Sequence, residues 1–542
     1  MYTIGFGGSN HDYSVCLVKD GEILFAIEEE RIVRKKYGYG INPRENRALG
    51  YVLKAEGITK DDISYFASND ILNNNYFYMC NDNVIQYNHH LTHAASAYYP
   101  SGFSEAAILV IDHSGSTIIE NNHLSTETVS YYLAKDKNIK CLQKVKGHGI
   151  QNENIVKRPS NSIGYMYSMV AKMLGCVGCY SDGKIHSESG KLMGLSSYGD
   201  PVYYNMISKY AYVSKGIVHI DIINVGKLLN TILKQDGSDK TIQNIAASVQ
   251  RLIEDMIVEC AKYLYDITGC KNLCIAGGVG LNGLANQAIM NNTKFENIFI
   301  QPAANDAGTS VGAALLAYHQ YNNEPSYLTR KMKNNFHGII YSDEYIEKRL
   351  LETKGILWEK DNDICRRAAE LIAKNNIIAW FQGGSEFGPR SLGNRSILAN
   401  PTNPHMKDIL NAKVKFREAY RPYAPSVLKE YQCEYFELEQ ETNYMLLIPQ
   451  ATEKAKKEIP AVVHVDNTAR VQTVSENFNL KLYKVIKEFY NITHTPVILN
   501  TSLNVMGEPI CETPEDAIRC FLKTNIDYLL IGNYFVGKQE FV

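Results

Sequence analysis

The stretch YTIGFGGSNHDYSVCLVKDGEILFAI, residues 2–27, decides the fold of this chain because it contains three short apolar runs joined by turns. Each run has the apolar alternation and length of a β-strand. The turn Lys19-Asp20-Gly21 separates the second run from the third, as in a hairpin. The sequence therefore predicts three strands, at residues 2–6, 13–18 and 23–27, with a polar loop after the first.

The same pattern recurs later in the chain, at residues 106–112 and 129–134. A strand that ends in a small polar turn and is followed by a hairpin and helices, found twice, is typical of duplicated actin-like ATPase folds. Residues 242–268 predict a long helix, and an apolar strand follows at 273–276. We therefore expect an α/β fold with an internal duplication in the N-terminal part.

A second α/β domain is predicted in the C-terminal part. Residues 322–325 and 331–335 are polar and show little periodicity, which is typical of a domain boundary. After them, residues 377–381 predict a strand that runs into a glycine turn and opens the second domain. The chain has 542 residues, more than one hydrophobic core normally organises. We expect one domain at residues 1–325 and another at 345–542.

Composition and charge argue against several classes of protein. The 56 basic and 58 acidic residues give a formal charge of −2, so no global field favours nucleic acid or an anionic membrane. No apolar run approaches the roughly 20 residues of a membrane span, and Met1 is not followed by a basic leader, so we expect a cytoplasmic protein. A structural zinc site at Cys176 and Cys179 is a less favoured alternative to small buried cysteines.

A short helix is predicted at residues 88–100, with Asn88 as its N-cap and Pro100 as its stop. Residues four apart on a helix are neighbours, so His89 and His93 can direct both imidazoles to one point. Two half-buried histidines that happen to share a face are the alternative. Carboxylates at a strand end and in a glycine-rich turn favour a metal site instead, made of His89, His93, Asp112 and Asp306. Iron(II), manganese, zinc and cobalt all suit these ligands.

Glycine turns after apolar strands predict a nucleotide site. The order strand, Gly277-Gly278, helix lets a phosphate approach the backbone at a helix N-terminus, although most glycine pairs are only turns. The pair Gly190-Lys191 and the turn at 305–308 favour the nucleotide interpretation.

Basic residues in the second half predict a site for a small anion. Arg390 follows Gly-Pro and Arg421 precedes Pro422, so both guanidinium groups lie in rigid turns that suit phosphate recognition. The alternative is a solvated helix face that carries Lys413, Arg417 and Arg421 at four-residue spacing.

Taken together, these motifs resemble the O-carbamoyltransferase family that includes the nodulation-factor, cephamycin and tobramycin carbamoyltransferases. The resemblance runs from residue 2 to the C-terminus and rests on segments that match in order: 5–12, 89–98, 190–195, 276–282, 387–395, 421–426 and 500–504. It implies an N-terminal duplicated actin-like (ASKHA-type) domain, similar to the universal tRNA threonylcarbamoyladenosine transferase. It also implies a C-terminal α/β domain similar to threonylcarbamoyl-adenylate synthase.

The resemblance implies ATP-dependent transfer of the carbamoyl group of carbamoyl phosphate, through carbamoyl-adenylate, to a hydroxyl of a specialised metabolite. It favours Fe(II) as the metal, and Mg²⁺ could accompany ATP. We expect a hydroxylated small-molecule acceptor and no nucleic-acid or membrane partner, and a homodimer is left open. The residues expected to hold the nucleotide are Lys191, Gly277, Gly278, Asn282 and Asn305. Those expected to hold carbamoyl phosphate are Arg390, Lys415, Arg421, Arg470, Asn500, Thr501, Ser502 and Asn504.

His11 is the candidate general base, because an imidazole titrates near neutral pH and the neighbouring Asp12 could orient its ring or the acceptor. An exposed loop histidine is the alternative. Two residues depart from the family pattern: His113, which could add or block a metal ligand, and Ser189, where relatives place glutamate. A tRNA threonylcarbamoyl-type transferase and a non-catalytic ATP- and metal-binding regulator are the other functions considered, and the acceptor alcohol cannot be read from the sequence.

Overall fold

The structure is a computed structural model that describes residues 1–80, 83–121, 123–152, 155–322 and 331–539. It divides into two compact units. Unit 1 comprises Met1–Val33 and Tyr37–Met332, and unit 2 comprises Arg34–Lys36 and Lys333–Val542. The predicted boundary segment at 322–325 lies, except for Asn322, outside the described residues.

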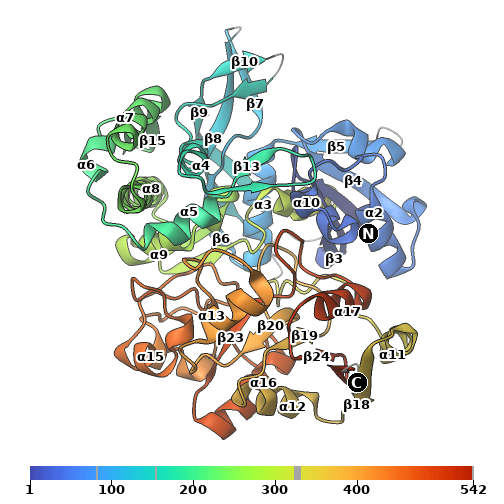
Figure 1. Cartoon of the computed structure of the whole chain (residues 1–542). Coiled ribbons are helices and arrows are strands. Elements are labelled where there is room, and N and C mark those ends of the chain that lie inside the picture. Colours follow the sequence, from blue (N-terminus) through green and yellow to red (C-terminus); the bar gives the residue numbers. More distant parts are fainter. Residues whose placement is uncertain (81–82, 122, 153–154, 323–330, 540–542) are drawn as a thin grey trace. The chain divides into compact units, whose positions relative to one another are not determined.

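Unit 1 contains two sheets built on the same plan (Figure 1). In each sheet the leading strand, β1 or β6, pairs antiparallel with a hairpin strand and parallel with a strand from later in the chain. This repetition confirms the α/β fold with an internal duplication. The first sheet has the order β3 (Glu22–Glu28), β2 (Ser14–Lys19), β1 (Tyr2–Gly7), β4 (Ile63–Asn69), β5 (Val84–Tyr87). The second has the order β17 (Asn297–Ile300), β16 (Asn272–Ala276), β6 (Glu105–Ile111), β8 (His123–Lys135), β7 (Thr117–Glu120), with β9 (Asn138–Gly147) also beside β8.

The predicted strands of the first hairpin are confirmed as β1, β2 and β3, and their apolar side chains form the core. Ile4, Phe6 and Val15 are fully buried and pack with residues of helix α2 (Arg47–Glu56). Helix α10 (Thr309–Tyr321) lies directly against β1, because a Cβ at Gly5 would stand 1.9 Å from the carbonyl oxygen of Ser310. Only glycine permits this approach, which brings the end of β1 close to the turn that precedes α10.

The predicted histidine helix is confirmed as α3 (His89–Ser101), and the Asn88 side chain caps it by accepting from the N–H of Leu91 at 3.1 Å. The prediction that Pro100 ends the helix is wrong: Pro100 lies inside the last turn, and Gly102, in the left-handed region at φ 77°, follows the helix. A proline late in a helix removes only one backbone donor, and glycine provides the terminating conformation. The long predicted helix is confirmed as α8 (Asp239–Thr268).

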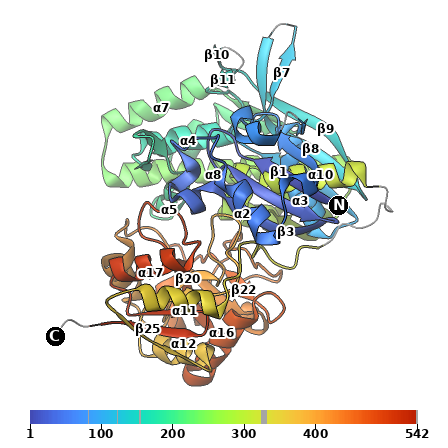
Figure 2. The ribbon, with the colours of Figure 1, turned by 90° about the vertical axis from the view of Figure 1, so that its right-hand side faces the viewer.

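Unit 2 is built on a mixed sheet of eight strands. Helices α12 (Ile364–Ala373) and α16 (Leu480–Thr493) lie side by side and share a buried core with the sheet (Figure 1, Figure 2). Helices α11 (Asp343–Glu352), α13 (Met406–Leu410), α15 (Glu453–Glu458) and α17 (Pro514–Lys523) complete the larger helical elements. The strand order is β18 (Ile356–Lys360), β25 (Tyr534–Lys538), β24 (Tyr528–Ile531), β19 (Ile378–Phe381), β20 (Arg395–Ala399), β23 (Val497–Ser502), β21 (Ala424–Leu428), β22 (Gln472–Val474).

The strand predicted at 377–381 is confirmed as β19, but it does not open the second unit. Helix α11, strand β18 and helix α12 all precede it. Strand β18 was missed because it lies at the edge of the sheet, where most of its side chains are exposed and its apolar pattern is weak.

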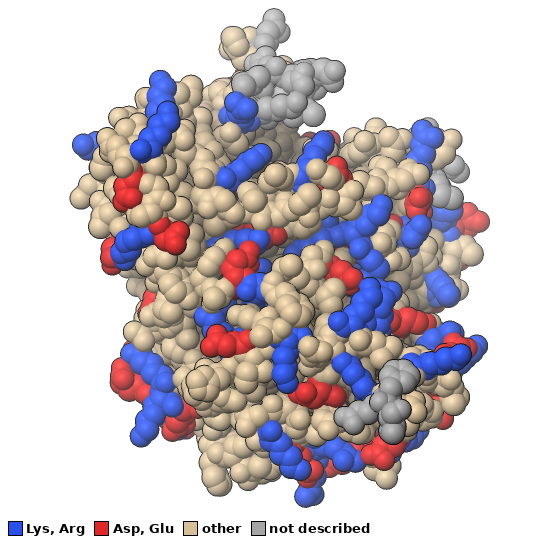
Figure 3. Space-filling model, in the orientation of Figure 1, with Lys and Arg blue, Asp and Glu red and all other residues tan. Residues whose placement is uncertain are grey.

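Within the described ranges, no helix combines the length and the apolar character needed to cross a membrane. On the face shown in Figure 3, Lys and Arg side chains are interspersed with Asp and Glu, so no extended field of one sign covers that face.

Candidate metal centre and anion site

Four side chains converge in unit 1 where the sequence predicts a metal site. The Nε2 atoms of His89 and His93, on the first turns of α3, lie 3.2 Å apart. Asp112, just after β6, places Oδ2 3.3 Å from the Nε2 of His89. Asp306 follows β17 and places Oδ1 3.6 Å from the same nitrogen and 3.5 Å from that of His93. All four side chains are buried, and their ligand atoms lie within 4.8 Å of one another.

The topology of the second sheet explains why residues so far apart in sequence meet. Strands β6, β16 and β17 are parallel, so their carboxyl ends lie at one edge of the sheet, and Asp112 and Asp306 follow two of those ends. Helix α3 packs against this sheet and brings its two histidines to the same edge. Ligand sites at the carboxyl ends of parallel strands are common in open α/β sheets.

The electrostatics of this cluster suit a cation. Burial acts to lower the pKa of His89, but contacts with Asp112 and Asp306 outweigh it and raise the pKa to about 10. Within the described residues, Nδ1 of His89 and Nδ1 of His93 have no hydrogen-bond partner, although both rings are fully buried. Two imidazoles and two carboxylates directed at one point fit a divalent transition metal. His113 is not part of this group, and its ring instead lies 5.2 Å from that of Tyr165.

A buried carboxylate that the sequence reading missed holds the start of α3. Oε1 of Glu127, on β8, accepts from the backbone N–H groups of His90 and Ser116, both at 3.0 Å. Asn88 also donates to Glu127, at 3.1 Å, and Lys144 forms an ion pair with it. Because these contacts join the N-terminus of α3 to β8, they fix the helix that carries both histidines. No spacing signal in the sequence links Glu127 to a helix forty residues earlier.

The candidate base lies beside this centre, in the loop after β1. Nδ1 of His11 is 3.1 Å from Oδ2 of Asp12, and Asn305 donates to the same oxygen at 2.9 Å. Asp12 has φ 56°, a left-handed conformation that is uncommon away from glycine and frequent at functional loops. Burial acts to lower the pKa of His11, but Asp12, Asp306 and Asp112 raise it to about 9. A divalent cation bound between Asp112 and Asp306 would offset part of that negative charge and lower the pKa of His11.

Aromatic rings that the sequence reading also missed border His11. The ring centroid of Tyr39 lies 5.7 Å from that of His11, and His186 stacks on Tyr39 at 3.9 Å. Tyr180 meets Tyr37 edge to face at 5.1 Å. These residues come from a loop near residue 38 and from the hairpin of β12 (Val177–Cys179) and β13 (Ile185–Ser187). Only the folded chain brings the two segments together, and the rings form a wall beside the candidate base.

The structure brings some of the predicted nucleotide residues to this centre. Gly277 has φ 90°, and a Cβ there would stand 2.2 Å from the carbonyl oxygen of Ile111. The N–H of Gly278 donates to Oδ1 of Asp112 at 3.2 Å. Asn282 instead exchanges hydrogen bonds with Gln250, both at 3.1 Å.

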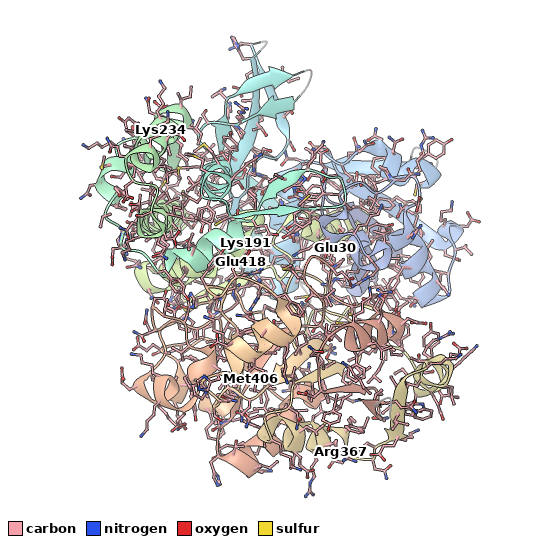
Figure 4. All side chains as sticks on the ribbon, viewed as in Figure 1. Glu30, Lys191, Lys234, Arg367, Met406 and Glu418 are labelled. Carbon is pink, nitrogen blue, oxygen red and sulfur yellow. The ribbon has the colours of Figure 1, made fainter. Side chains whose placement is uncertain are left out.

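Lys191 lies on α5 (Ser189–Ser196) (Figure 4). It pairs with Glu188 at 3.1 Å and donates to the carbonyl oxygen of Val177 at 2.8 Å. The family pattern has glutamate where this chain has Ser189. Here Glu188, one residue earlier, contacts Lys191. Nothing among these contacts joins Lys191 to the metal cluster.

In unit 2 two of the predicted anion ligands, Ser502 and Asn504, contact the buried Lys415. Nζ of Lys415 lies 2.8 Å from Oδ1 of Asn504, 3.2 Å from its carbonyl oxygen and 3.3 Å from Oγ of Ser502. Burial, with help from the positive charges of Arg417 and Arg421, lowers the pKa of Lys415 to about 7. These hydrogen-bond partners are all neutral oxygens, so an anion bound beside Lys415 would favour its charged form.

Several guanidinium groups gather near this lysine. Burial lowers the pKa of Arg470, and the neighbouring charges of Arg390 and Arg421 lower it further. Arg417, which the sequence reading did not assign to the site, stacks on Tyr423 at 4.3 Å, and burial lowers its pKa to about 10. Buried cations that destabilise one another in this way are suited to binding an anion. Only one residue separates Arg417 from Lys415 in the sequence, and this proximity could have indicated that Arg417 belongs to the same group.

The remaining predicted anion ligands divide between two faces of the sheet. The Asn500 side chain donates to Ser426 at 3.1 Å and is buried. Thr501 is its neighbour on β23, and because strand side chains alternate, it points to the face opposite Asn500 and Ser502. Alternation therefore directs the Thr501 side chain away from that of Ser502, which contacts Lys415.

The loop that carries Arg390 is held by two buried charged residues that the sequence reading did not assign. Oε1 of Glu386 accepts from the N–H groups of Leu392 at 2.7 Å and Asn394 at 2.8 Å. Arg395 stacks on Phe381 at 3.6 Å and donates to the carbonyl oxygen of Gln382. The side chains of Glu386 and Arg395 therefore hold the loop by binding its backbone N–H and carbonyl groups.

Comparison with known proteins gives matches over both units. Family models described as carbamoyltransferase N-terminus and carbamoyltransferase C-terminus match residues 74–315 and 369–538. Nodulation protein NolNO of Sinorhizobium fredii is 34% identical, over 98% of this chain and 79% of its own length. Nodulation protein NolO of Bradyrhizobium diazoefficiens is 36% identical, over 83% of this chain and 79% of its own length. An uncharacterised protein of Synechocystis sp. is 31% identical over 99% of this chain and 97% of its own.

Among solved structures, full-length HypF in its phosphate- and nucleotide-bound form covers 60% of this chain and 47% of its own length. The sequence identity is 13% and the TM-score is 0.44, a likeness too distant to carry a conclusion.

Proposed function

The chain belongs to the carbamoyltransferase family and is a carbamoyltransferase, and from this premise we propose the donor, the intermediate and the acceptor class. The donor is carbamoyl phosphate, ATP activates the carbamoyl group as carbamoyl-adenylate, and the acceptor is a hydroxyl of a specialised metabolite. The observation that carries this proposal is the buried group of cations in unit 2. Burial and the charges of Arg390 and Arg421 lower the pKa of Arg470, and the nearby Lys415 is held by neutral oxygens. Such a group suits a multiply charged substrate.

Activation is assigned to unit 2. Water releases carbamate from carbamoyl phosphate and leaves inorganic phosphate. An oxygen of the carbamate then attacks the α-phosphorus of ATP, and pyrophosphate departs. Charge builds on phosphate oxygens during both displacements, and in this proposal the charges of Lys415, Arg421 and Arg470 oppose it. Burial lowers the pKa of Lys415, so binding of an anion should favour protonation of Lys415, and protonation should favour binding of the anion.

Transfer is assigned to unit 1. The hydroxyl of the acceptor attacks the carbonyl carbon of the adenylate, AMP leaves, and the proton of the hydroxyl passes to the imidazole of His11. Asp12, 3.1 Å from Nδ1 of that ring, orients it with the help of Asn305. A divalent transition metal held by the two histidines and two aspartates would supply positive charge for the nucleotide phosphate. We propose iron(II) for that metal, on the family resemblance, and Mg²⁺ as the companion of ATP.

The nucleotide contacts are proposed for backbone groups near Gly277 and Gly278 and for the side chain of Asn305, which already contacts Asp12. We assign the acceptor to the side of His11 that borders Tyr39 and His186, because these rings lie next to the proposed base. The two half-reactions belong to separate units, so the adenylate has to pass from one to the other.

The experiment is carbamoyl-phosphate-dependent release of pyrophosphate from ATP in the absence of acceptor. Wild-type protein should release pyrophosphate, and Arg421→Ala should lower the rate by about 30-fold or more, since a lost charge contact in such a site costs roughly 2–4 kcal/mol. Arg366→Ala is the matched control, because that arginine lies exposed on α12 and pairs with Glu370. Normal pyrophosphate release by a folded Arg421→Ala variant would remove this residue from the activation site.

A further inference from the structure

A cavity of about 440 Å³ lies within unit 2, and none of the residues proposed to bind carbamoyl phosphate lines it. It is formed at the end of β19, the N-terminal end of α16 and the first turns of α11. The volume is in the range of small-molecule sites, about 300–1,000 Å³. Its principal lining residues are Phe336, Tyr341, Phe381, Phe478, Gln382 and Lys481.

Aromatic rings form two parts of the wall. The ring centroids of Phe336 and Phe478 lie 5.3 Å apart, and those of Tyr341 and Phe381 lie 6.1 Å apart. Aromatic walls favour a flat, unsaturated ligand, because ring stacking adds to the burial of apolar surface. The guanidinium carbon of Arg395 lies 3.6 Å from the ring centroid of Phe381, a contact that helps to hold this ring in place.

One positive charge faces this aromatic lining. Nζ of Lys481 donates to Oε1 of Gln382 at 2.6 Å, a neutral partner, and among the described residues no carboxylate lies within 4.0 Å of it. Burial lowers the pKa of Lys481, although the negative charge of Asp343 acts in the opposite direction. Asp343 also lines the cavity, but Asn533 donates to it at 2.9 Å and Lys360 lies 3.5 Å away.

The amides at the floor of the cavity are already paired. Asn479 donates to Oδ1 of Asn394 at 3.0 Å, and Asn394 donates to the carbonyl oxygen of Gly384 at 2.8 Å. They therefore offer little to a new ligand, and Lys481 decides which charge the cavity accepts.

We propose that this cavity is a binding site for a planar aromatic molecule that carries one anionic group, a carboxylate or a phosphate. The ring packs against Phe336, Tyr341 and Phe478, and the anionic group meets Lys481. The proposal does not depend on the proposed donor and acceptor, because no residue that lines the cavity belongs to the site around Lys415. It concerns a second small molecule that this protein recognises.

The test uses two fluorescent probes of similar shape, 8-anilinonaphthalene-1-sulfonate and the uncharged N-phenyl-1-naphthylamine, titrated into the full-length protein. Lys481→Met should weaken sulfonate binding by about tenfold or more and leave the uncharged probe within about twofold, since only the former loses a charge contact. Tyr341→Ala should weaken both probes. Lys484→Met is the matched control, because Lys484 lies exposed on the same helix, and it should change neither.

Competition separates the two sources of the anionic group. Displacement of the sulfonate by AMP identifies a nucleotide-type phosphate, and displacement by indole-3-carboxylate identifies an aromatic carboxylate. Equal sulfonate affinity in wild type and Lys481→Met, with both proteins folded by circular dichroism, would overturn the proposal. So would a failure of both competitors at millimolar concentration.

Discussion

Lys415 should make anion binding by unit 2 depend steeply on pH. Burial lowers its pKa to about 7, so the free protein loses this charge as the pH rises through 7, whereas an ordinary lysine keeps it to above pH 10. Sulfate is a suitable probe because its own charge does not change in this range. If only the protonated lysine binds it, the apparent dissociation constant equals the intrinsic one divided by the protonated fraction.

The size of the effect follows from the pKa. With a pKa near 7, roughly 90% of the molecules carry the proton at pH 6 and about 3% at pH 8.5, so the dissociation constant should rise by about 30-fold between these values. The assay is isothermal titration calorimetry with sulfate in a cationic buffer at constant ionic strength. Lys415→Met should bind sulfate weakly at both pH values, and Lys415→Arg should bind it with little pH dependence, since arginine stays charged.

Lys413→Met is the matched control, because Lys413 lies two residues earlier with a half-exposed side chain and faces Asp527 at 3.8 Å. It should retain the wild-type pH profile. A wild-type dissociation constant that is flat between pH 6 and 8.5 would refute the reasoning, and so would an unchanged profile in Lys415→Met.

Three further predictions concern unit 1. The double variant His89→Ala/His93→Ala should purify without a stoichiometric transition metal, measured by plasma mass spectrometry, while pyrophosphate release persists. The control His148→Ala changes an exposed histidine and should keep the metal. Retention of the metal in the double variant would contradict the ligand assignment. His11→Ala should consume carbamoyl phosphate and ATP yet transfer to acceptor at least ~100-fold more slowly, and a rate within a few-fold of wild type would make His11 structural. Glu127→Gln should weaken metal affinity by about 10- to 100-fold in competition with a chelator, because it loosens the start of α3, and unchanged affinity would count against that role.

Much of unit 1 was predictable because its signals are local. Alternation gave β1, β2 and β3, and helical spacing placed His89 beside His93. Asp112 was predicted because it ends an apolar strand and Asp306 because it lies in a glycine-rich turn, and the parallel pairing of β6, β16 and β17 brings them together.

The features that were not predicted depend on contacts between segments distant in sequence, or on the solvent exposure of side chains. The link from Glu127 to α3 and the meeting of Tyr39 with His186 have no local pattern. Strand β18 was not predicted because it lies at the sheet edge and most of its side chains are exposed. The end of α3 was predicted wrongly at Pro100 because the last turn of this helix accommodates a proline. Thr501 was assigned with its neighbours as a segment, although strand alternation separates their side chains.

The central claim is that ATP activates the carbamoyl group as an adenylate before transfer, and hydroxylamine trapping tests it most directly. Carbamoyl-adenylate and hydroxylamine give N-hydroxyurea and AMP, so ¹³C-labelled carbamoyl phosphate should yield labelled N-hydroxyurea in step with AMP and pyrophosphate. Reactions without ATP, and with Arg421→Ala, measure the background from spontaneous decomposition of the donor. The account predicts equal amounts of N-hydroxyurea and AMP well above that background. N-hydroxyurea that forms equally without ATP, or with no AMP, would contradict it.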